Sequence, residues 1–164
     1  MYLERMLHLT SRMLDDPNRE RRMEVVAEAR TWIDTPFRHQ GSRKGHGCDC
    51  IGFLRRIGTD MDLCTEDLWG PKAAPFEGYS ELPDPDKFMA ALNIFMDEIS
   101  LKDILYADII LFQSRVNPTH LGLVTDEGMI HGYLKTKKVV EHSLDTMWFR
   151  HIKTVYRFPV FASR

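Results

Sequence analysis

The hydrophobic positions divide the chain into two halves with different periodicities. Before about residue 100, apolar residues recur at helical spacing, which predicts helices over 2–14, 20–33, 50–61 and 86–99. After Ser100 the chain consists of short segments that are rich in β-branched and aromatic residues and are separated by turn signals, which predicts strands. These segments are "ILYADIILF", "THLGLVTD", "MIHGYL", "KVVEH" and "TVYRFPVF". Helices followed by strands indicate an α+β fold with an antiparallel sheet.

Two irregular segments interrupt the helical half. "DTPFRHQGSRKGHG" contains a proline and three glycines and is predicted to be a loop. Residues 64–85 contain four prolines and form a second, longer Pro-rich loop, and loops of that length are usually functional. The 164 residues fit one domain, 1–164, with 1–22 as an N-terminal helical extension.

Composition and charge exclude some function classes. The formal net charge of -2 gives no electrostatic case for a nucleic-acid partner. The charged N-terminal segment lacks the apolar centre of a signal peptide, so we expect synthesis in the cytoplasm without export by that route. No apolar run is long enough for a transmembrane helix, and no membrane partner is expected. Three cysteines without an export signal suggest reduced thiols rather than a disulfide framework.

The stretch "KGHGCDCIGFLRR" places a cysteine where a helix is predicted to begin. Asp49 is a suitable N-cap for that helix, and Cys50 then falls in its first turn. The helix dipole favours a thiolate there, which would lower the thiol pKa and create a nucleophile. Gly52 would leave space beside the sulfur. The simpler interpretation is that Cys50 is a small buried hydrophobic residue, which is the commoner role of such a cysteine.

A cysteine nucleophile needs a base and a group that orients the base, and two histidines on neighbouring predicted strands could supply them. A turn between Thr125 and Asp126 would place His120 directly opposite His131, with their Cβ atoms about 5 Å apart. A turn centred on Glu127-Gly128 would offset them by four residues, about 13 Å along the strand. The sequence allows both turns, and the catalytic interpretation requires the earlier one.

Four segments in order, "TPFRHQG", "CDCIGF", "HLGLV" and "MIHGY", resemble the NlpC-type cell-wall cysteine peptidases, a papain-like family. The resemblance covers about residues 24–160. It is strongest to the branch encoded by phages and phage-like particles. In that branch a second cysteine precedes the Asp-Cys motif, and a segment like "MWFRHIKTVYRFP" ends the chain.

The resemblance implies a single papain-like α+β domain. Its N-terminal helices would pack on a C-terminal antiparallel sheet, with the nucleophile at a helix N-terminus. It implies Cys50 as nucleophile, His120 as general base and His131 as the orienting third member. The implied substrate is the peptide stem of peptidoglycan, and no cofactor is required. The phage-like branch implies a tail-associated enzyme packaged into a particle, with other tail or particle proteins as partners.

The expected substrate-binding residues, which surround the nucleophile, are Phe37, Asp49, Ile51 and Gly52. Two of them, Phe37 and Ile51, depart from the family pattern. The family often has Tyr at the position of Phe37, so the hydroxyl that lines the site there is missing. It usually has Ser at the position of Ile51, where that residue is associated with the free amino end of the stem. Neither departure removes the predicted triad.

Three alternatives stay open. The first is a tail-assembly component with the same fold and no catalysis. The second is a thioesterase-like or acyltransferase-like hydrolase, although the order Cys then His argues against the circularly permuted acyltransferases. The third is a zinc module built from His39, His46, Cys48, Cys50 and Cys64, whose spacing is poor because C-x-C is not the usual zinc knuckle. The remaining histidines, His8, His142 and His151, are interpreted as isolated surface or packing residues.

Overall fold

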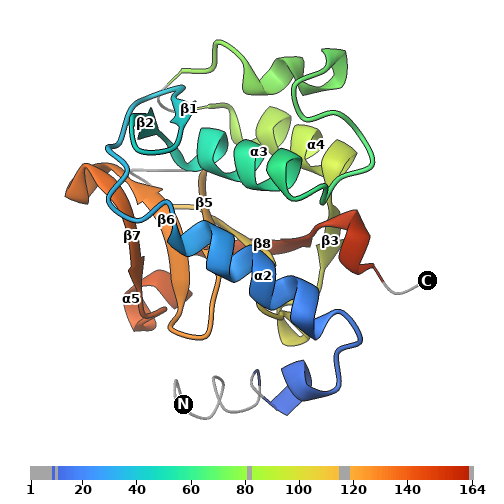
Figure 1. The fold of residues 1–164 in the computed structure, drawn as a ribbon. Helices are drawn as coiled ribbons and strands as arrows, with labels where there is room; N and C mark the ends of the chain where they lie inside the picture. Colours follow the sequence, from blue (N-terminus) through green and yellow to red (C-terminus); the bar gives the residue numbers. More distant parts are fainter. Residues whose placement is uncertain (1–8, 10, 81–82, 115–118, 163–164) are drawn as a thin grey trace.

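The computed structural model describes residues 9, 11–80, 83–114 and 119–162. Its helices gather in the first part of the chain and its sheet in the second (Figure 1). The α-helices are α2 (Arg19–Arg30), α3 (Cys50–Asp60), α4 (Pro85–Phe95) and α5 (Thr146–Phe149). Short 3-10 helices are η1 (Pro71–Phe76), η2 (Leu101–Asp103), η3 (Leu134–Thr136) and η4 (Pro159–Phe161).

A six-stranded antiparallel sheet forms the second half, in the order β3-β8-β4-β5-β6-β7. Its strands are β3 (Asp97–Ile99), β4 (Ile109–Phe112), β5 (His120–Val124), β6 (Met129–Tyr133), β7 (Lys138–His142) and β8 (Ile152–Arg157). A separate two-stranded sheet, β1 (Ser42–Arg43) with β2 (Gly47–Cys48), lies in the glycine-rich loop that was predicted before α3. The predicted helix-then-strand organisation is therefore confirmed.

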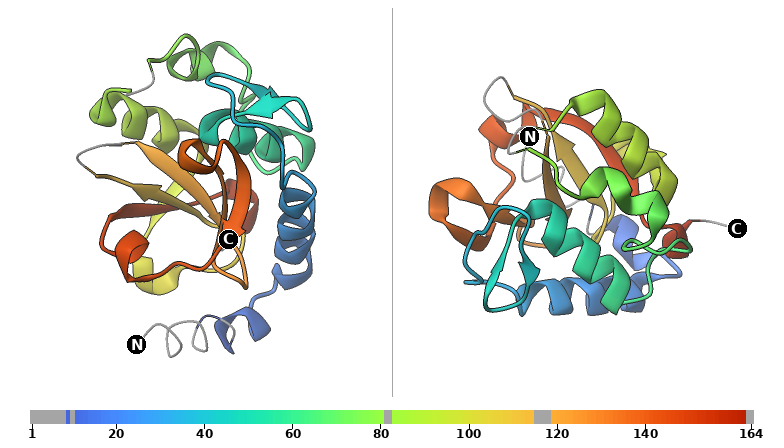
Figure 2. Two further views of the ribbon diagram at one scale, coloured as in Figure 1. Left: turned by 90° about the vertical axis from the view of Figure 1, so that its left-hand side faces the viewer. Right: turned by 90° about the horizontal axis from the view of Figure 1, so that it is seen from above.

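The two layers pack through apolar faces. Helix α3 is buried along most of its length and lies against β5 and β6, and α2 and α4 flank it (Figures 1 and 2). Strands β4 and β5 are buried at every position. Burial of this apolar surface, at about 25 cal/mol per Å², is the main force that holds the helices on the sheet.

Several predicted boundaries were wrong for local reasons. The helix predicted to end at residue 99 ends at Phe95, and β3 then joins the edge of the sheet. The strand predicted over "ILYADIILF" is shortened to β4, because Ala107 has φ 64 and Asp108 Oδ2 accepts the N–H of Leu105 at 2.8 Å. Most of the helix predicted over 2–14 lies outside the described residues. The last residues of the expected extension, from Arg19, belong to α2.

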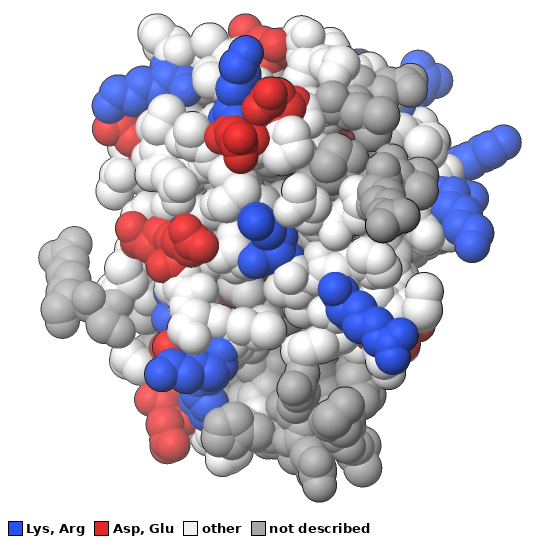
Figure 3. Space-filling view, turned by 180° about the vertical axis from the view of Figure 1, so that it is seen from behind, with Lys and Arg blue, Asp and Glu red and all other residues white. Residues whose placement is uncertain are grey.

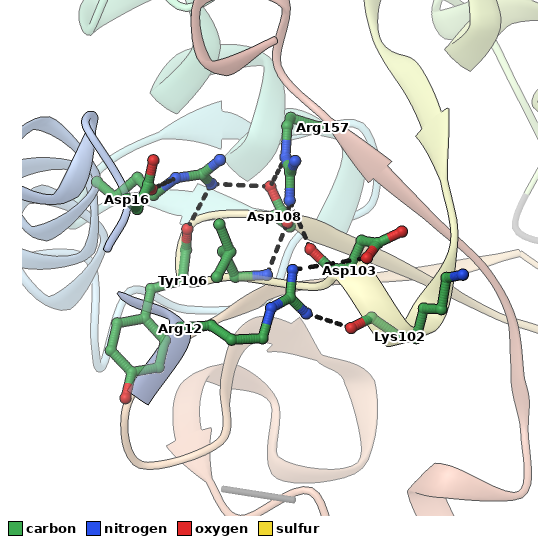
Figure 4. Close-up of polar contacts among 9 residues, drawn as sticks. Arg12, Asp16, Lys102, Asp103, Tyr106, Asp108 and Arg157 are labelled. Carbon is green, nitrogen blue, oxygen red and sulfur yellow. Dashed lines mark hydrogen bonds and ion pairs between the residues drawn. The ribbon is translucent and has the colours of Figure 1, made fainter. Parts of the chain in front are cut away.

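A buried ion cluster joins α2 to the sheet (Figure 4). The Asp108 carboxylate lies 2.9 Å from Arg22 Nη1 and 2.7 Å from Arg157 Nη2. Asp16 Oδ2 approaches Arg22 Nε to 2.5 Å from the turn that precedes α2. Arg22 and Asp108 are fully buried, so α2 contributes a buried cation to the interior. Such charges persist in the interior only because they are paired.

Charges on the face opposite to the view of Figure 1 are mixed (Figure 3). Among the described residues of that face, lysine and arginine side chains lie among aspartate and glutamate side chains. Within the part of the chain that the structure describes, no helix is both long and apolar enough to span a bilayer.

Candidate active site

The first turn of α3 positions Cys50 as the sequence predicts. Asp49 is the N-cap, and its Oδ1 accepts the N–H of Gly52 at 2.8 Å. Strand β6 comes very close to this turn, because Gly132 has no side chain facing the backbone of Asp49 and Cys50. Helix α3 also lies against β5, the strand that carries His120. The start of the helix is therefore held against both histidine-bearing strands.

Cys50 and His120 line one cavity of about 110 Å³. The loops before and after α3 and the ends of β5 and β6 enclose it. Its lining residues are Phe37, His39, Asp49, Cys50, Ile51, Tyr79, Pro83, Thr119, His120, Gly132, Tyr133 and Leu134. Two larger surface hollows, of about 540 and 560 Å³, are lined by neither cysteine nor histidine. The predicted nucleophile and base therefore share the cavity best suited to their chemistry.

The two predicted catalytic histidines contact each other, but by neither of the predicted registers. Leu123 pairs with Ile130 and Val124 with Met129, so the turn is centred on Asp126-Glu127. This intermediate register offsets His120 and His131 by two residues, which keeps both side chains on one face of the sheet. His120 Nε2 and His131 Nδ1 form a short hydrogen bond. The expectation that the catalytic interpretation requires the earlier turn was wrong, because the observed register also brings the two side chains together.

A third histidine extends this pair. His142, at the end of β7, lies with its Nε2 2.8 Å from Nε2 of His131. Its Nδ1 lies 2.9 Å from the carbonyl oxygen of Ser143. The interpretation of His142 as an isolated histidine was therefore wrong. The signal was available in the sequence, because His142 ends the strand after the one that carries His131, but it required the β6-β7 register.

Aromatic rings surround the histidines. The Tyr133 ring stacks on that of His131, with centroids 4.8 Å apart and planes 20° apart. Trp148 of α5 contacts the rings of all three histidines, with centroids 5.1 to 5.7 Å away. His120 and His131 are consequently buried, at 5% and 0% exposure. Apolar surroundings of this kind disfavour a charged imidazole.

Burial sets the resting protonation of the site. It raises the pKa of the Cys50 thiol to about 12, and the charge of Asp49 adds to the rise, while backbone hydrogen bonds oppose it. Burial also lowers the pKa of His120 to about 4, with a further contribution from His142, and it lowers the pKa of His131. The expected lowering of the thiol pKa by the helix dipole was therefore wrong. At rest the cavity therefore holds a neutral thiol and a neutral imidazole.

Three of the four predicted substrate-binding residues lie in the cavity. Phe37, Asp49 and Ile51 line it. Gly52 does not line it: a Cβ there would come within 1.8 Å of the Gly41 carbonyl oxygen. Gly52 is required for packing of the loop against α3, and the space expected beside the sulfur is filled by that loop.

Sequence analysis missed Tyr79, which belongs to the Pro-rich loop. Its hydroxyl donates to Asp49 Oδ2 at 2.5 Å, and Gln40 N–H donates to the same oxygen at 2.7 Å. Tyr79 thus supplies a hydroxyl to a cavity in which Phe37 has none. Nearby, Arg55 donates to the carbonyls of Leu68 and Phe76, which holds the loop over the site. Tyr79 and Pro83 make this loop one wall of the cavity.

The zinc alternative gains no support from the arrangement. In the ranges that the structure describes, no group of three or more His, Cys, Asp or Glu side chains is placed to hold a metal ion. Cys48, Cys50 and Cys64 are free thiols. Burial raises the pKa of Cys48 and Cys64 to about 12, as it does for Cys50.

No family model and no curated protein matches the chain. Solved structures do resemble it. The NlpC/p60 domain of the peptidoglycan hydrolase SagA matches 80% of this chain and 94% of its own, with a TM-score of 0.52 and 21% identity. A Staphylococcus aureus protein described as similar to lipoprotein, of the NLP/P60 family, matches 85% of this chain and 41% of its own, with a TM-score of 0.56 and 18% identity.

The structural likeness defines the class of fold. The chain has the papain-like α+β fold of NlpC/p60 domains, with a helix that begins at a cysteine packed against an antiparallel sheet. At this level of identity the likeness establishes the fold, and the chemistry rests on the residues of the cavity.

Proposed function

We propose that this protein is a cysteine peptidase or amidase that hydrolyses the peptide stems of peptidoglycan. The observation that carries the proposal is that Cys50 and His120 line one cavity while His131 holds the far side of the His120 ring. A nucleophile, a base and an orienting group in this relation are the components of covalent acyl transfer. The peptidoglycan hydrolase named among the structural neighbours supports the choice of substrate.

The resting protonation states prescribe the order of proton movements. As Cys50 Sγ attacks an amide carbonyl carbon, its proton passes to His120 Nδ1, since Nε2 of that ring faces His131. The carbonyl π electrons move to oxygen, and the backbone N–H of Cys50 at the helix start stabilises that oxyanion. The His120 imidazolium then protonates the leaving nitrogen as the C–N bond breaks, which leaves a thioester on Cys50.

Hydrolysis repeats the sequence with water as nucleophile. His120 takes a proton from water as the water oxygen attacks the thioester carbon. His120 then returns that proton to the Cys50 sulfur as the C–S bond breaks. The products are a carboxylic acid and the free enzyme. A neutral His120 has a lone pair that can accept a proton across the neutral pH range, although burial makes it a weaker base than a free imidazole.

The finer assignment to a phage tail or phage-like particle is a proposal that rests on "MWFRHIKTVYRFP" and on Cys48 before the Asp-Cys motif. In such a setting the enzyme would be made in the cytoplasm, packaged with tail or particle proteins and used to open the wall locally. Co-purification with assembled particles from the producing cells tests this assignment. Recovery of the chain only as free protein would contradict it.

Digestion of purified sacculi tests the activity. We expect wild type to release stem fragments, whose masses identify the scissile bond. Cys50→Ala should release none, and Cys64→Ala, which removes a thiol outside the cavity, should behave as wild type. Silence of wild type on several wall types would contradict the proposal and favour the non-catalytic alternative.

A further inference from the structure

The three histidines form one continuous hydrogen-bonded series that runs from the cavity to the partly exposed edge of the sheet. His120 contacts His131, His131 contacts His142, and His142 contacts the carbonyl oxygen of Ser143. All three lie on successive antiparallel strands, β5, β6 and β7. Only the first two are needed for a Cys-His-His triad, so the third calls for an explanation.

The Ser143 carbonyl decides the direction of every bond in the series. A carbonyl oxygen can only accept, so Nδ1 of His142 must carry a proton. In a neutral His142 ring, Nε2 is then an acceptor, and the nitrogen it faces, Nε2 of His131, must donate. His131 Nδ1 is therefore an acceptor, and His120 Nε2 must donate to it.

The consequence appears at the nucleophile. With its proton on Nε2, His120 has a free lone pair on Nδ1, which is the form that a general base requires. A reversed series would place the proton of His120 on Nδ1 and remove the base. In other catalytic triads an incorrect histidine tautomer costs about 10⁴ in rate.

From this geometry we propose that His142 is a positioning residue that acts through His131 to fix the tautomer of His120. The proposal rests on the proposed function for its catalytic consequence, while the tautomers themselves are a property of the folded protein. The Ser143 carbonyl orients His142, His142 orients His131, and His131 orients His120, which faces the cavity with Cys50.

The aromatic rings around the series support this role. Trp148 contacts His120, His131 and His142 alike, and Tyr133 stacks on His131. These rings limit access of water to the central bonds, so His131 depends on His142 for its second hydrogen bond. The Trp148 ring therefore packs on His142 and on the two buried histidines, which sets His142 apart from an isolated surface histidine.

Two variants and one control test the proposal. His142→Ala removes the acceptor for His131, whereas His142→Gln can accept from His131 with Oε1 and donate to Ser143 with its amide. His151→Ala is the matched control, because His151 also directs Nδ1 at a carbonyl, that of Met147 at 2.7 Å, and lies outside the series. Thermal unfolding shows that each variant is folded.

The direct measurement is the tautomer of each histidine by two-dimensional ¹H–¹⁵N NMR of the imidazole nitrogens at pH 7.5. We expect the proton on Nε2 for His120 and His131 and on Nδ1 for His142. In His142→Ala the His131 signal should shift toward a tautomer mixture, and in His151→Ala the three assignments should be unchanged. A wild-type His131 with its proton on Nδ1 would overturn the proposal whether or not the protein cleaves sacculi.

The rate at which each protein hydrolyses a purified stem peptide supplies the second readout. We expect His142→Ala to lower kcat/KM about tenfold, in the range seen when an orienting partner of a functional histidine is removed. His142→Gln and His151→Ala should stay within about threefold of wild type. A kcat/KM of His142→Ala equal to that of wild type would overturn the catalytic consequence. The same holds if His142→Gln keeps the wild-type tautomers and yet loses as much kcat/KM as His142→Ala. Failure of all proteins, wild type included, would count against the proposed function, and the NMR result would still decide the tautomers.

Discussion

Gly132 on β6 lies directly against the backbone of Cys50. A Cβ placed on Gly132 would be 3.2 Å from the Cys50 nitrogen and 3.0 Å from the carbonyl carbon of Asp49. These contacts are tighter than ordinary van der Waals separation, and both partners are backbone atoms, so the helix start would have to move by a few tenths of an ångström. The close approach of this strand therefore fixes where the nucleophile stands.

Gly132→Ala should consequently impair catalysis more than folding. We expect kcat/KM to fall about tenfold or more, because small misplacements of reacting groups are costly, with about 1 kcal/mol of lost stability. Gly70→Ala is the control: its Cβ would approach Asp67 Oδ2 to 3.2 Å, a similarly close contact, but Gly70 does not line the cavity and the contact is with a side chain that can move. Equal activity of the two variants would show that the position of Cys50 does not depend on this contact.

The buried histidines predict loss of stability in acid. The pKa of His120 is lowered to about 4 in the folded state and is about 6.5 when unfolded, so the unfolded chain binds more protons between these values. Stability should be fully present above pH 6.5 and fall as the pH drops toward 4, by about 3 kcal/mol for this group, with a further loss from His131. Urea unfolding at several pH values measures the slope.

His120→Gln provides the comparison for that slope, since its amide can still donate to His131. The variant should lose the contribution of one group and show a shallower dependence between pH 6.5 and 4. A wild-type stability that stays constant or rises over this interval would contradict neutral buried histidines.

The cluster of Arg22, Asp108 and Arg157 predicts a large effect on stability. Asp108→Asn removes the counter-charge that Arg22 and Arg157 share and leaves Asp16 as the remaining partner of the fully buried Arg22. We therefore expect a loss of about 3 kcal/mol, the lower end for a broken buried pair. Asp60→Asn, which breaks an exposed pair with Arg56, should cost at most about 1 kcal/mol. Similar costs for the two variants by urea unfolding would show that the buried pair is not a structural anchor.

Tyr79→Phe removes one hydroxyl from the cavity wall. Asp49 Oδ2 would keep the Gln40 N–H but lose its hydrogen bond from the phenol, which should cost about 1–3 kcal/mol of stability. Because Asp49 caps the helix of the nucleophile, we also expect lower kcat/KM. Chemical unfolding and turnover of stem fragments check both effects, and a variant equal to wild type in both would assign Tyr79 to the surface of the loop rather than to the site.

Local signals accounted for the parts of the site that could be predicted from sequence. The N-cap at Asp49 and the apolar run after it correctly placed Cys50 at a helix start, and "HLGLV" and "MIHGY" correctly predicted neighbouring strands. The hairpin register could not be predicted, because three turns compete within "TDEG" and the choice depends on sheet packing. Tyr79 contacts Asp49 across 30 residues of sequence, which no local pattern indicates. His142 contacts His131 from the neighbouring strand, and placing it required the β6-β7 register.

The protonation state of the Cys50 thiol could not be predicted from local sequence either. The position of Cys50 in the first turn of α3 favours a thiolate, but its burial and the carboxylate of Asp49 outweigh the dipole. The extent of burial depends on how β5, β6 and the loops close around the helix start. Sequence alone provides the residue and its element, and the fold determines its protonation.

Cys50 is the nucleophile of the proposed reaction, and the roles of the other cavity residues depend on it. The most direct test is the hydrolysis rate of a purified stem fragment by wild type, Cys50→Ala and Cys64→Ala under matched conditions, with folding verified by thermal unfolding. We expect Cys50→Ala to lose at least about 10³-fold in kcat, as removal of a nucleophile from a catalytic unit does, and Cys64→Ala to stay near wild type. A Cys50→Ala protein that retains activity within tenfold of wild type would contradict this role of Cys50.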